Sequence, residues 1–342
     1  MGKNKVVTFG EIMLKFSPKS YRRILQSTEM DVEYAGAEAN VAVSLANYGL
    51  HPAFVCKLPD NDLGDSAINA LRHYGVNVDS IVRGGERIGI YFVEKGASQR
   101  PSKVIYDRKD SAIASADAKD FDWDIIFKGA EWFHFTGITP ALSDSLAEIC
   151  LEACRVAKSK GITISCDLNY RKKLWSREKA REVMSEICKY VDVCIANEED
   201  AFDVFGINAE QSDINSGKID KQSYASVARQ LQQKFGFKYV AITLRESISA
   251  SDNKWSAILY DGKVFYNSRT YSIHLVDRIG GGDSFGGGLI YGLLEYKEAQ
   301  KALEFAVAAS CLKQTIEGDF NLVNVSDVLQ LLKGNGSGRI QR

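Results

Sequence analysis

The chain has 342 residues, of which 45% are apolar and 25% are charged, the proportions of a globular protein. Its 43 basic and 44 acidic residues nearly cancel, which argues against a nucleic-acid partner, because such proteins carry a basic surface. No apolar run approaches the ~18 residues of a membrane span, and the N-terminus has neither the apolar core of a signal peptide nor a myristoylation pattern. We therefore expect no membrane partner and a cytoplasmic location.

Short β-rich segments alternate with helical ones along the chain. In chain order, strands are predicted at residues 6–11, 53–57, 131–135, 162–167, 191–196 and 239–243. Helices are predicted at residues 40–48, 65–74, 143–160, 223–235, 283–296 and 301–312. This alternation predicts βαβ units and an α/β fold with a mostly parallel sheet that helices cover.

Two segments interrupt this alternation. Residues 15–32 lack a helical pattern, and residues 89–107 hold two aromatic and β-branched runs around a Gly/Ser/Pro turn, which indicates a hairpin. Together they predict a small antiparallel sheet outside the main one. This sheet is either a flap beside a pocket or an edge decoration. Tyr91, Tyr106 and Arg108 favour the flap, because polar-tipped aromatic side chains and arginine suit a polar ligand.

The seven cysteines are scattered through apolar segments, an odd number that fits free thiols in a reducing compartment. Cys150 and Cys154 lie four residues apart on a predicted helix, so half of a metal site and core packing are the alternatives. No CxxC or HExxH motif accompanies them, and the sequence favours core packing.

The segment DRIGGGDSFGGG, from Asp277 to Gly288, places two glycine triplets around one aspartate. A short β run enters the segment and a helix leaves it, so the first triplet would expose backbone N–H groups at a helix N-terminus. Such a site binds anions, and phosphate is the natural ligand. Asp283 would stand beside that phosphate and could accept the proton of an attacking hydroxyl. Its alternative role, a simple N-cap, does not explain the three preceding glycines.

The second triplet, at residues 286–288, predicts close packing of the helix against a neighbouring element or a nucleotide. Neither common nucleotide motif is present. The GxGxxG pattern fails because its sixth position, counted from Gly280, is Phe285, and no GxxxxGK[ST] occurs. The first failure disfavours an oxidoreductase.

Residues 277–283 resemble the second signature of the ribokinase-like (PfkB) carbohydrate kinases, usually written D-T-x-G-A-G-D. The segment YAGAEANVA at residues 34–42 resembles their first signature, a glycine pair that leads to an asparagine at a helix start. The resemblance covers nearly the whole chain. It implies one ribokinase-like three-layer α/β/α domain over residues 1–334, with a lid from about 15–32 and 89–110, and a flexible tail at 335–342.

The resemblance also implies roles for individual residues. It makes Asp283 the general base and Gly280, Gly281 and Gly282 the anion hole. The implied substrate contacts are Gly36, Asn40, Tyr91, Tyr106, Arg108, Arg171 and Asp319. The implied nucleotide contacts are Asn169, Asn197, Thr243, Arg245, Gly280 and Gly282. ATP and Mg²⁺ are the implied cofactors, a monovalent cation is left open, and a homodimer through the lid is expected.

Three segments resemble the 2-keto-3-deoxygluconate kinases within this family: GEIML at 10–14, RPSKVIYDR at 100–108 and DLNYRKKLW at 167–175. A sugar acid carries a carboxylate, for which Arg108 and Arg171 offer guanidinium groups. The alternative for each arginine is an exposed surface charge. The expected reaction is ATP-dependent phosphorylation of 2-keto-3-deoxy-D-gluconate on its terminal hydroxyl. A kinase of a neutral sugar such as fructose or ribose and a non-catalytic binding protein are the alternatives.

Several positions depart from the family pattern. Arg278 and Gly281 replace the usual Thr and Ala of the second signature. The family motif N-x-x-E, which is tied to magnesium and phosphate, stands as NEED at residues 197–200, so Glu199 and Asp200 are candidates for an indirect metal role. The loop expected after the strand at 239–243 is usually rich in glycine; here it holds Arg245, which could contact phosphates instead.

Overall fold

The central feature of the fold is a ten-stranded sheet, seen in the computed structural model, which describes residues 5–197, 199–208 and 221–334. Seven neighbouring strands pair in parallel: β5 (Ile81–Arg83), β4 (His51–Leu58), β1 (Lys5–Phe9), β8 (Ala130–Thr136), β9 (Thr163–Asp167), β10 (Val193–Ala196) and β11 (Tyr239–Ser247). The antiparallel strands beyond β11 are β12 (Asp252–Tyr260), β13 (Phe265–Asn267) and β14 (Tyr271–His274). The mostly parallel sheet is confirmed, whereas the predicted tail at 335–342 lies outside the described residues.

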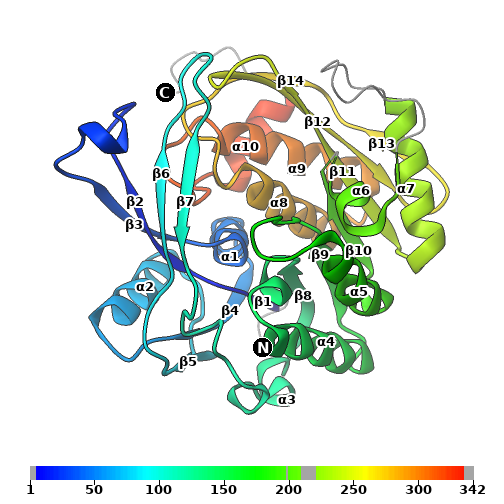
Figure 1. Ribbon diagram of the computed structural model, residues 1–342. Helices are drawn as coiled ribbons and strands as arrows, with labels where there is room; N and C mark the ends of the chain where they lie inside the picture. Colours follow the sequence, from blue (N-terminus) through cyan, green and yellow to red (C-terminus); the bar gives the residue numbers. More distant parts are fainter. Residues whose placement is uncertain (1–4, 198, 209–220, 335–342) are drawn as a thin grey trace.

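Helices cover both faces of this sheet (Figure 1). They are α1 (Ala37–Asn47), α2 (Asp62–His73), α3 (Trp123–Ile126), α4 (Asp144–Ser159), α5 (Arg177–Ile187), α6 (Asp200–Phe205), α7 (Lys221–Phe235), α8 (Gly281–Glu295), α9 (Ala299–Lys313) and α10 (Val325–Leu332). Short 3₁₀ turns lie at Ile24–Gln26, Ala118–Asp120, Thr139–Ala141 and Cys188–Tyr190.

Alternation along the strands divides the interior into two cores. On β10, Cys194 and Ala196 face a core shared with α4, α5 and α7, whereas Val193 and Ile195 face a core shared with α8 and α9. Side chains that point alternately to the two faces are expected of a strand covered on both sides. The layers are therefore helix, sheet and helix, as the sequence predicted.

Capping residues fix several helix starts. The Ser143 side chain accepts a hydrogen bond from the Leu146 N–H at 3.2 Å, and Asn61 accepts from the N–H groups of the second and third residues of α2. A cap of this kind stabilises a helix by about 1 kcal/mol. Helix α5, which the sequence analysis did not predict, begins in the same way at Ser176.

A second, four-stranded sheet lies to one side of the main body (Figure 1). We call it the lid sheet; its strands, in order, are β3 (Asp31–Ala35), β2 (Met13–Ser17), β6 (Ile90–Glu94) and β7 (Lys103–Asp107). The separate small sheet is confirmed with one correction. Its outer pairs are antiparallel, but the central pair β2–β6 is parallel, because the chain crosses through the main sheet between these two strands.

Three element boundaries differ from the prediction in ways that matter for the site. Helix α1 begins three residues earlier, at Ala37, because Ala37, Glu38 and Ala39 are good helix formers. Helix α8 begins at Gly281 rather than Asp283. Strand β11 continues to Ser247 through antiparallel pairing with β12, so Arg245 lies on a strand and not in a loop.

All seven cysteines are buried and free, which confirms core packing for Cys150 and Cys154. Burial raises the pKa of both thiols well above the ordinary value. Within the described residues, no helix combines the length and the apolar character that crossing a bilayer would require.

Candidate active site

The first glycine triplet forms the turn into α8. Gly280 is the N-cap, with φ of +79°, a left-handed conformation that favours glycine. A Cβ atom at this position would also lie 2.1 Å from the backbone oxygen of Asp319. A Cβ on Gly282 would meet no atom within 4 Å, so this residue borders open space. The turn therefore leaves the first backbone N–H groups of α8 facing a cavity, where an anion can accept from them.

Lys313 supports this turn from below. Its side chain is fully buried, and its ammonium group donates to the backbone oxygens of Ile279 and, at 3.5 Å, of Asp277. The side chain of Asp277 accepts from the N–H groups of Ile279 at 3.2 Å and Gly318 at 3.3 Å. With the carbonyl oxygens occupied in this way, the turn is held in one conformation. The sequence analysis did not single out Lys313.

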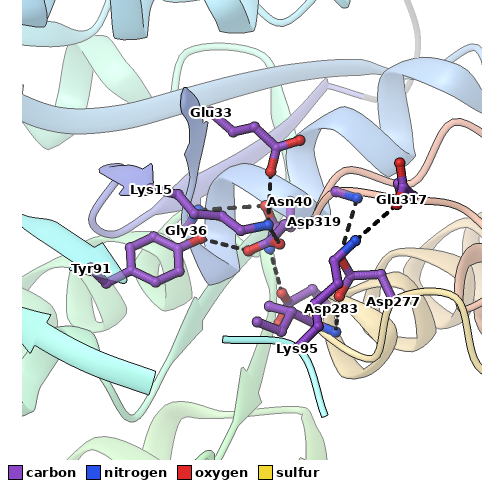
Figure 2. A network of polar contacts seen from close by, with 12 residues as sticks. Lys15, Glu33, Gly36, Asn40, Tyr91, Lys95, Asp277, Asp283, Glu317 and Asp319 are labelled. Atoms are coloured by element: carbon purple, nitrogen blue, oxygen red, sulfur yellow. Dashed lines mark hydrogen bonds and ion pairs between the residues drawn. The ribbon is translucent and has the colours of Figure 1, made fainter. Parts of the chain in front are cut away.

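Asp283 is the third residue of α8, which excludes the simple N-cap role. Asn40, in the first turn of α1, donates from Nδ2 to Asp283 Oδ2 at 2.6 Å and orients the carboxylate (Figure 2). Burial raises the pKa of Asp283 to about 6, while the bond from Asn40 lowers it. Such a carboxyl is ionised at neutral pH, yet it is a stronger base than an exposed aspartate, which suits it to accept a proton.

These groups border a cavity of about 350 Å³ between α8, the lid sheet and the carboxyl ends of the parallel strands. This is where ligands bind in open α/β sheets. The cavity brings together the predicted substrate contacts Gly36, Asn40, Tyr91, Tyr106, Arg108, Arg171 and Asp319. It also brings together the predicted nucleotide contacts Asn169, Asn197, Thr243, Arg245, Gly280 and Gly282, and Gly281 and Asp283 line it as well.

The lid sheet carries a polar row on one face, and the two tyrosines of this row line the cavity. Glu33, Lys15, Tyr91 and Tyr106 are opposite one another across its four strands and therefore share one face. The rings of Tyr91 and Tyr106 stack with centroids 5.9 Å apart, and the Arg108 guanidinium lies 5.4 Å from the Tyr106 ring. We call the four residues Glu33, Lys15, Tyr91 and Tyr106 the inner row.

The two arginines predicted to bind the substrate carboxylate, Arg108 and Arg171, have different hydrogen-bond partners. Arg108 donates to Glu11, at 2.8 Å from Nε, and Ser111 donates to the other oxygen of Glu11 at 2.7 Å. Arg171 donates to the backbone oxygen of Tyr170 at 3.1 Å, and among the described residues no carboxylate lies within 4 Å of it as an ion-pair partner. Arg171 thus brings to the cavity a guanidinium group without a direct ion-pair partner in the described residues, although its charge acts on Asp167 and Asp283.

Both arginines also border a larger cavity of about 1280 Å³ along β7, which lies next to the first. They therefore stand where the two cavities meet.

The end of β9 contributes two further polar groups. Asp167 lines the cavity, and its pKa is raised well above the ordinary value by burial and by the charges of Asp200 and Asp283. Asn169 has φ of +39°, which is uncommon for a residue other than glycine, although asparagine adopts it more readily than most. The sequence analysis assigned no role to Asp167; its position directly after a strand is the signal that could have found it.

The two candidates for a metal role do not line the first cavity. Glu199 borders the larger cavity. Asp200 is buried and accepts from the N–H groups of Tyr170 at 3.0 Å and Asn197 at 3.1 Å. Within the described part of the chain, no group of three or more His, Cys, Asp or Glu side chains is arranged to hold a metal ion.

The second glycine triplet packs against helices. A Cβ on Gly287 would lie 2.8 Å from Cβ of Ser44 in α1, and one on Gly288 would lie 2.8 Å from Cα of Ala306 in α9. Of the two interpretations of this triplet, contact with a neighbouring element is therefore the observed one. The close approach of α1, α8 and α9 fixes the start of α8 at the cavity.

The model of the pfkB family of carbohydrate kinases matches residues 3–321. The chain belongs to this family. A 2-dehydro-3-deoxygluconokinase from Thermotoga maritima, known from its crystal structure, is 53% identical and superposes with a TM-score of 0.93, over 97% of this chain and 99% of that one. A 2-dehydro-3-deoxygalactonokinase from Haloferax volcanii is 34% identical over 98% of each chain. Fructokinase-1 from Oryza sativa subsp. japonica is 28% identical over 96% of this chain and 97% of that one.

These matches confirm the predicted family and the ribokinase-like fold. As a pfkB-family carbohydrate kinase, the protein is a phosphotransferase with an alcohol group as acceptor. The cavity at the start of α8 is lined by the glycine turn, by Asp283 and by Arg171.

Proposed function

We propose that the protein phosphorylates a 2-dehydro-3-deoxy sugar acid, foremost 2-dehydro-3-deoxy-D-gluconate, on its terminal hydroxyl with ATP as donor. The observation that carries the proposal is the guanidinium of Arg171 on the cavity wall, which makes no direct ion pair in the described residues, because a carboxylate-bearing substrate needs such a partner. The names of the Thermotoga maritima and Haloferax volcanii relatives support a sugar acid over a neutral sugar.

In the proposed reaction, the terminal hydroxyl oxygen of the sugar acid forms a bond to the γ-phosphorus of ATP. The bond from that phosphorus to the bridging oxygen breaks, and its electron pair leaves with ADP. Asp283 accepts the hydroxyl proton, and Asn40 keeps the accepting oxygens in place. The N–H groups at the start of α8 bind the phosphoryl oxygens, where positioning and charge stabilisation provide most of the rate.

Polyphosphate binding is supported by a pair of arginines at the β11 side of the cavity. Burial and the charge of Arg245 lower the pKa of Arg278, so two guanidinium groups lie near each other. In the described residues, Nε of both arginines and the indole N–H of Trp255 are buried without a hydrogen-bond partner. Three unpaired N–H donors beside two positive charges are suited to an anion with several oxygens, such as the phosphates of ATP.

The donor set also fits Mg²⁺ in the way this ion is usually bound, through one or two carboxylates and substrate phosphates. Asp167, one of the acidic residues that line the cavity, would hold the ion, whereas Asp200 is occupied by backbone N–H groups. When bound, Mg²⁺ supplies charge neutralisation on the phosphate oxygens. Under the glycine turn, the backbone oxygens of Ile279 and Asp277 accept from the buried Lys313 ammonium group.

We also propose that the lid sheet closes over the substrate and forms a homodimer through its outer face. Opposite the inner row, Val32, Phe16, Phe92 and Ile105 form an apolar row across the four strands. Val32 is 57% exposed and Ile105 is 40% exposed, and Phe16 stacks on Phe92. A continuous apolar face of this kind is typical of a protein interface. We call it the outer row.

Two substitutions test the assignment of the two substrates. Arg171→Met should raise KM for 2-dehydro-3-deoxy-D-gluconate by about 10- to 100-fold, the value of a hydrogen bond to a charged group, and leave KM for ATP within about twofold. Arg245→Met should raise KM for ATP and leave KM for the sugar acid nearly unchanged. Arg87→Met, which removes the ion pair with Asp107 and the hydrogen bonds to the backbone oxygens of Asp107 and Ile88, serves as the control. If turnover of the sugar acid survives replacement of both Arg108 and Arg171, these arginines do not recognise its carboxylate, and the argument for a sugar acid over a neutral sugar fails.

A further inference from the structure

Lys15, at the centre of the inner row, is a buried cation that the proposed reaction does not use. Its side chain is 1% exposed. Strand β2 places it between Glu33 on β3 and Tyr91 on β6. Burying an ammonium group is costly unless it is paired, so its partners must fix its position closely.

The partners of Lys15 join the lid sheet to the main body. The ammonium lies 2.7 Å from Glu33 Oε2 on the lid and 2.6 Å from Asp319 Oδ1, in the segment that follows α9 (Figure 2). Burial alone would lower the pKa of Lys15, but the charges of Asp319, Asp277 and Glu33 raise it above its ordinary value. Lys15 is therefore a fixed ammonium group, and it sits 304 residues away from Asp319 in the chain.

Asp319, which Lys15 holds in place, in turn fixes the hydroxyl group of Tyr91. Its second oxygen, Oδ2, accepts the hydroxyl hydrogen of Tyr91 at 2.6 Å. Burial and the charge of Asp319 raise the pKa of Tyr91 well above its ordinary value, so the phenol keeps its proton. A phenol has one hydrogen to donate, and here Asp319 takes it. The Tyr91 oxygen and the Asp319 carboxylate can therefore accept further hydrogen bonds but cannot donate any.

We propose that Lys15 is a positioning residue for substrate specificity. By holding Asp319 so that it accepts the hydrogen bond from the Tyr91 hydroxyl, Lys15 makes this wall of the cavity an acceptor surface, which binds hydroxyl hydrogens and repels a carboxylate. The proposal rests on the sugar-acid function given above. It also sets the direction of the substrate: the hydroxyl-bearing part lies along Tyr91 and Asp319, and the carboxylate turns towards Arg171.

The test is a full kinetic comparison with 2-dehydro-3-deoxy-D-gluconate and ATP. Lys15→Met should raise KM for the sugar acid by about tenfold and change KM for ATP by less than about twofold, because the acceptor wall touches only the sugar acid. Lys15→Arg should restore a value near that of the wild type. Lys19→Met, which removes an exposed pair with Glu29 at the end of the same strand, is the matched control and should behave as the wild type.

A double substitution separates positioning from general stability. If Lys15 acts through Tyr91, then Lys15→Met combined with Tyr91→Phe should raise KM no further than Tyr91→Phe alone. Should Lys15→Met fail to fold, Tyr91→Phe carries the test by itself: a roughly tenfold higher KM for the sugar acid supports the proposal, and an unchanged KM overturns it.

The outcomes also separate this proposal from the function on which it rests. Wild-type enzyme that phosphorylates no sugar acid overturns the function. Wild-type enzyme that does so, with Lys15→Met showing unchanged KM for the sugar acid or an equal rise in both KM values, overturns only the role of Lys15.

Discussion

The two walls of the active-site cavity are built from different chemistry. At the start of α8, the wall is backbone: a glycine turn held by Lys313 presents N–H groups, and Asp283, the proposed base, lies in the first turn of the same helix. At the lid sheet, the wall is a row of side chains that are paired with one another across three segments of the chain. The first wall can be specified by a dozen consecutive residues, whereas the second exists only once distant residues meet.

This contrast predicts that single substitutions at the α8 wall affect the chemical step, and that those at the lid wall affect binding. Asp283→Asn should show the largest effect. It should lower kcat by roughly 10²- to 10⁴-fold, the usual contribution of a general base, while calorimetric binding of the sugar acid stays within about threefold. Asp144→Asn, in the first turn of α4 and exposed, is the control. A kcat near that of the wild type would contradict the role of Asp283 as base.

Gly280→Ala should cause the second largest loss of activity. Alanine is strained at φ of +79°, and its Cβ would overlap the Asp319 backbone oxygen, so the turn must move. We expect kcat/KM to fall by about 100-fold, since a shift of about 1 Å at a reacting centre has this effect. Gly129→Ala has φ of +74° without a clash and controls for backbone strain alone. Equal losses of activity in both variants would contradict the account of this turn.

The pH dependence sharpens the comparison further. Asp283 must be unprotonated to act, so kcat/KM should fall as pH drops through about 6. Asn40→Ala removes a donor that favours the charged form, so the acid limb should move up by about one pH unit. Asn47→Ala on the same helix should leave the limb in place. If the Asn40 variant keeps the wild-type acid limb, the bond to Asp283 does not tune the base.

The outer row gives the smallest expected effect on catalysis. Val32→Asp places a charge in the proposed lid–lid interface, so light scattering should show a monomer where the wild type is a dimer. We expect kcat to change by less than about twofold, because surface substitutions away from the site are usually mild. Val264→Asp, at another exposed apolar position, is the control. A wild-type protein that is monomeric at the same concentration would rule the interface out.

The same contrast explains what could be predicted from the sequence. The alternation of strands and helices and the segment 277–288 are local patterns, and the predicted fold class and the role expected for that turn follow from consecutive residues. The roles of Lys15 and Lys313 could not be predicted, because Asp319 lies 304 residues from Lys15 and Ile279 lies 34 residues from Lys313. Nothing near either lysine in the chain indicates that it is buried. The bounds of α8 and β11 differed because tertiary contacts with α9 and β12 extend elements that local preference alone would end.

The most direct test of the proposed function is the initial rate of ADP release by the wild-type enzyme, with ATP and a series of acceptors at equal concentrations. The series holds 2-dehydro-3-deoxy-D-gluconate, its galactonate isomer, fructose and ribose. We predict a kcat/KM for one of the two sugar acids at least about 100-fold above that for either neutral sugar, because only a sugar acid engages Arg171. Equal or faster turnover of fructose or ribose would contradict the assignment of a sugar acid as substrate.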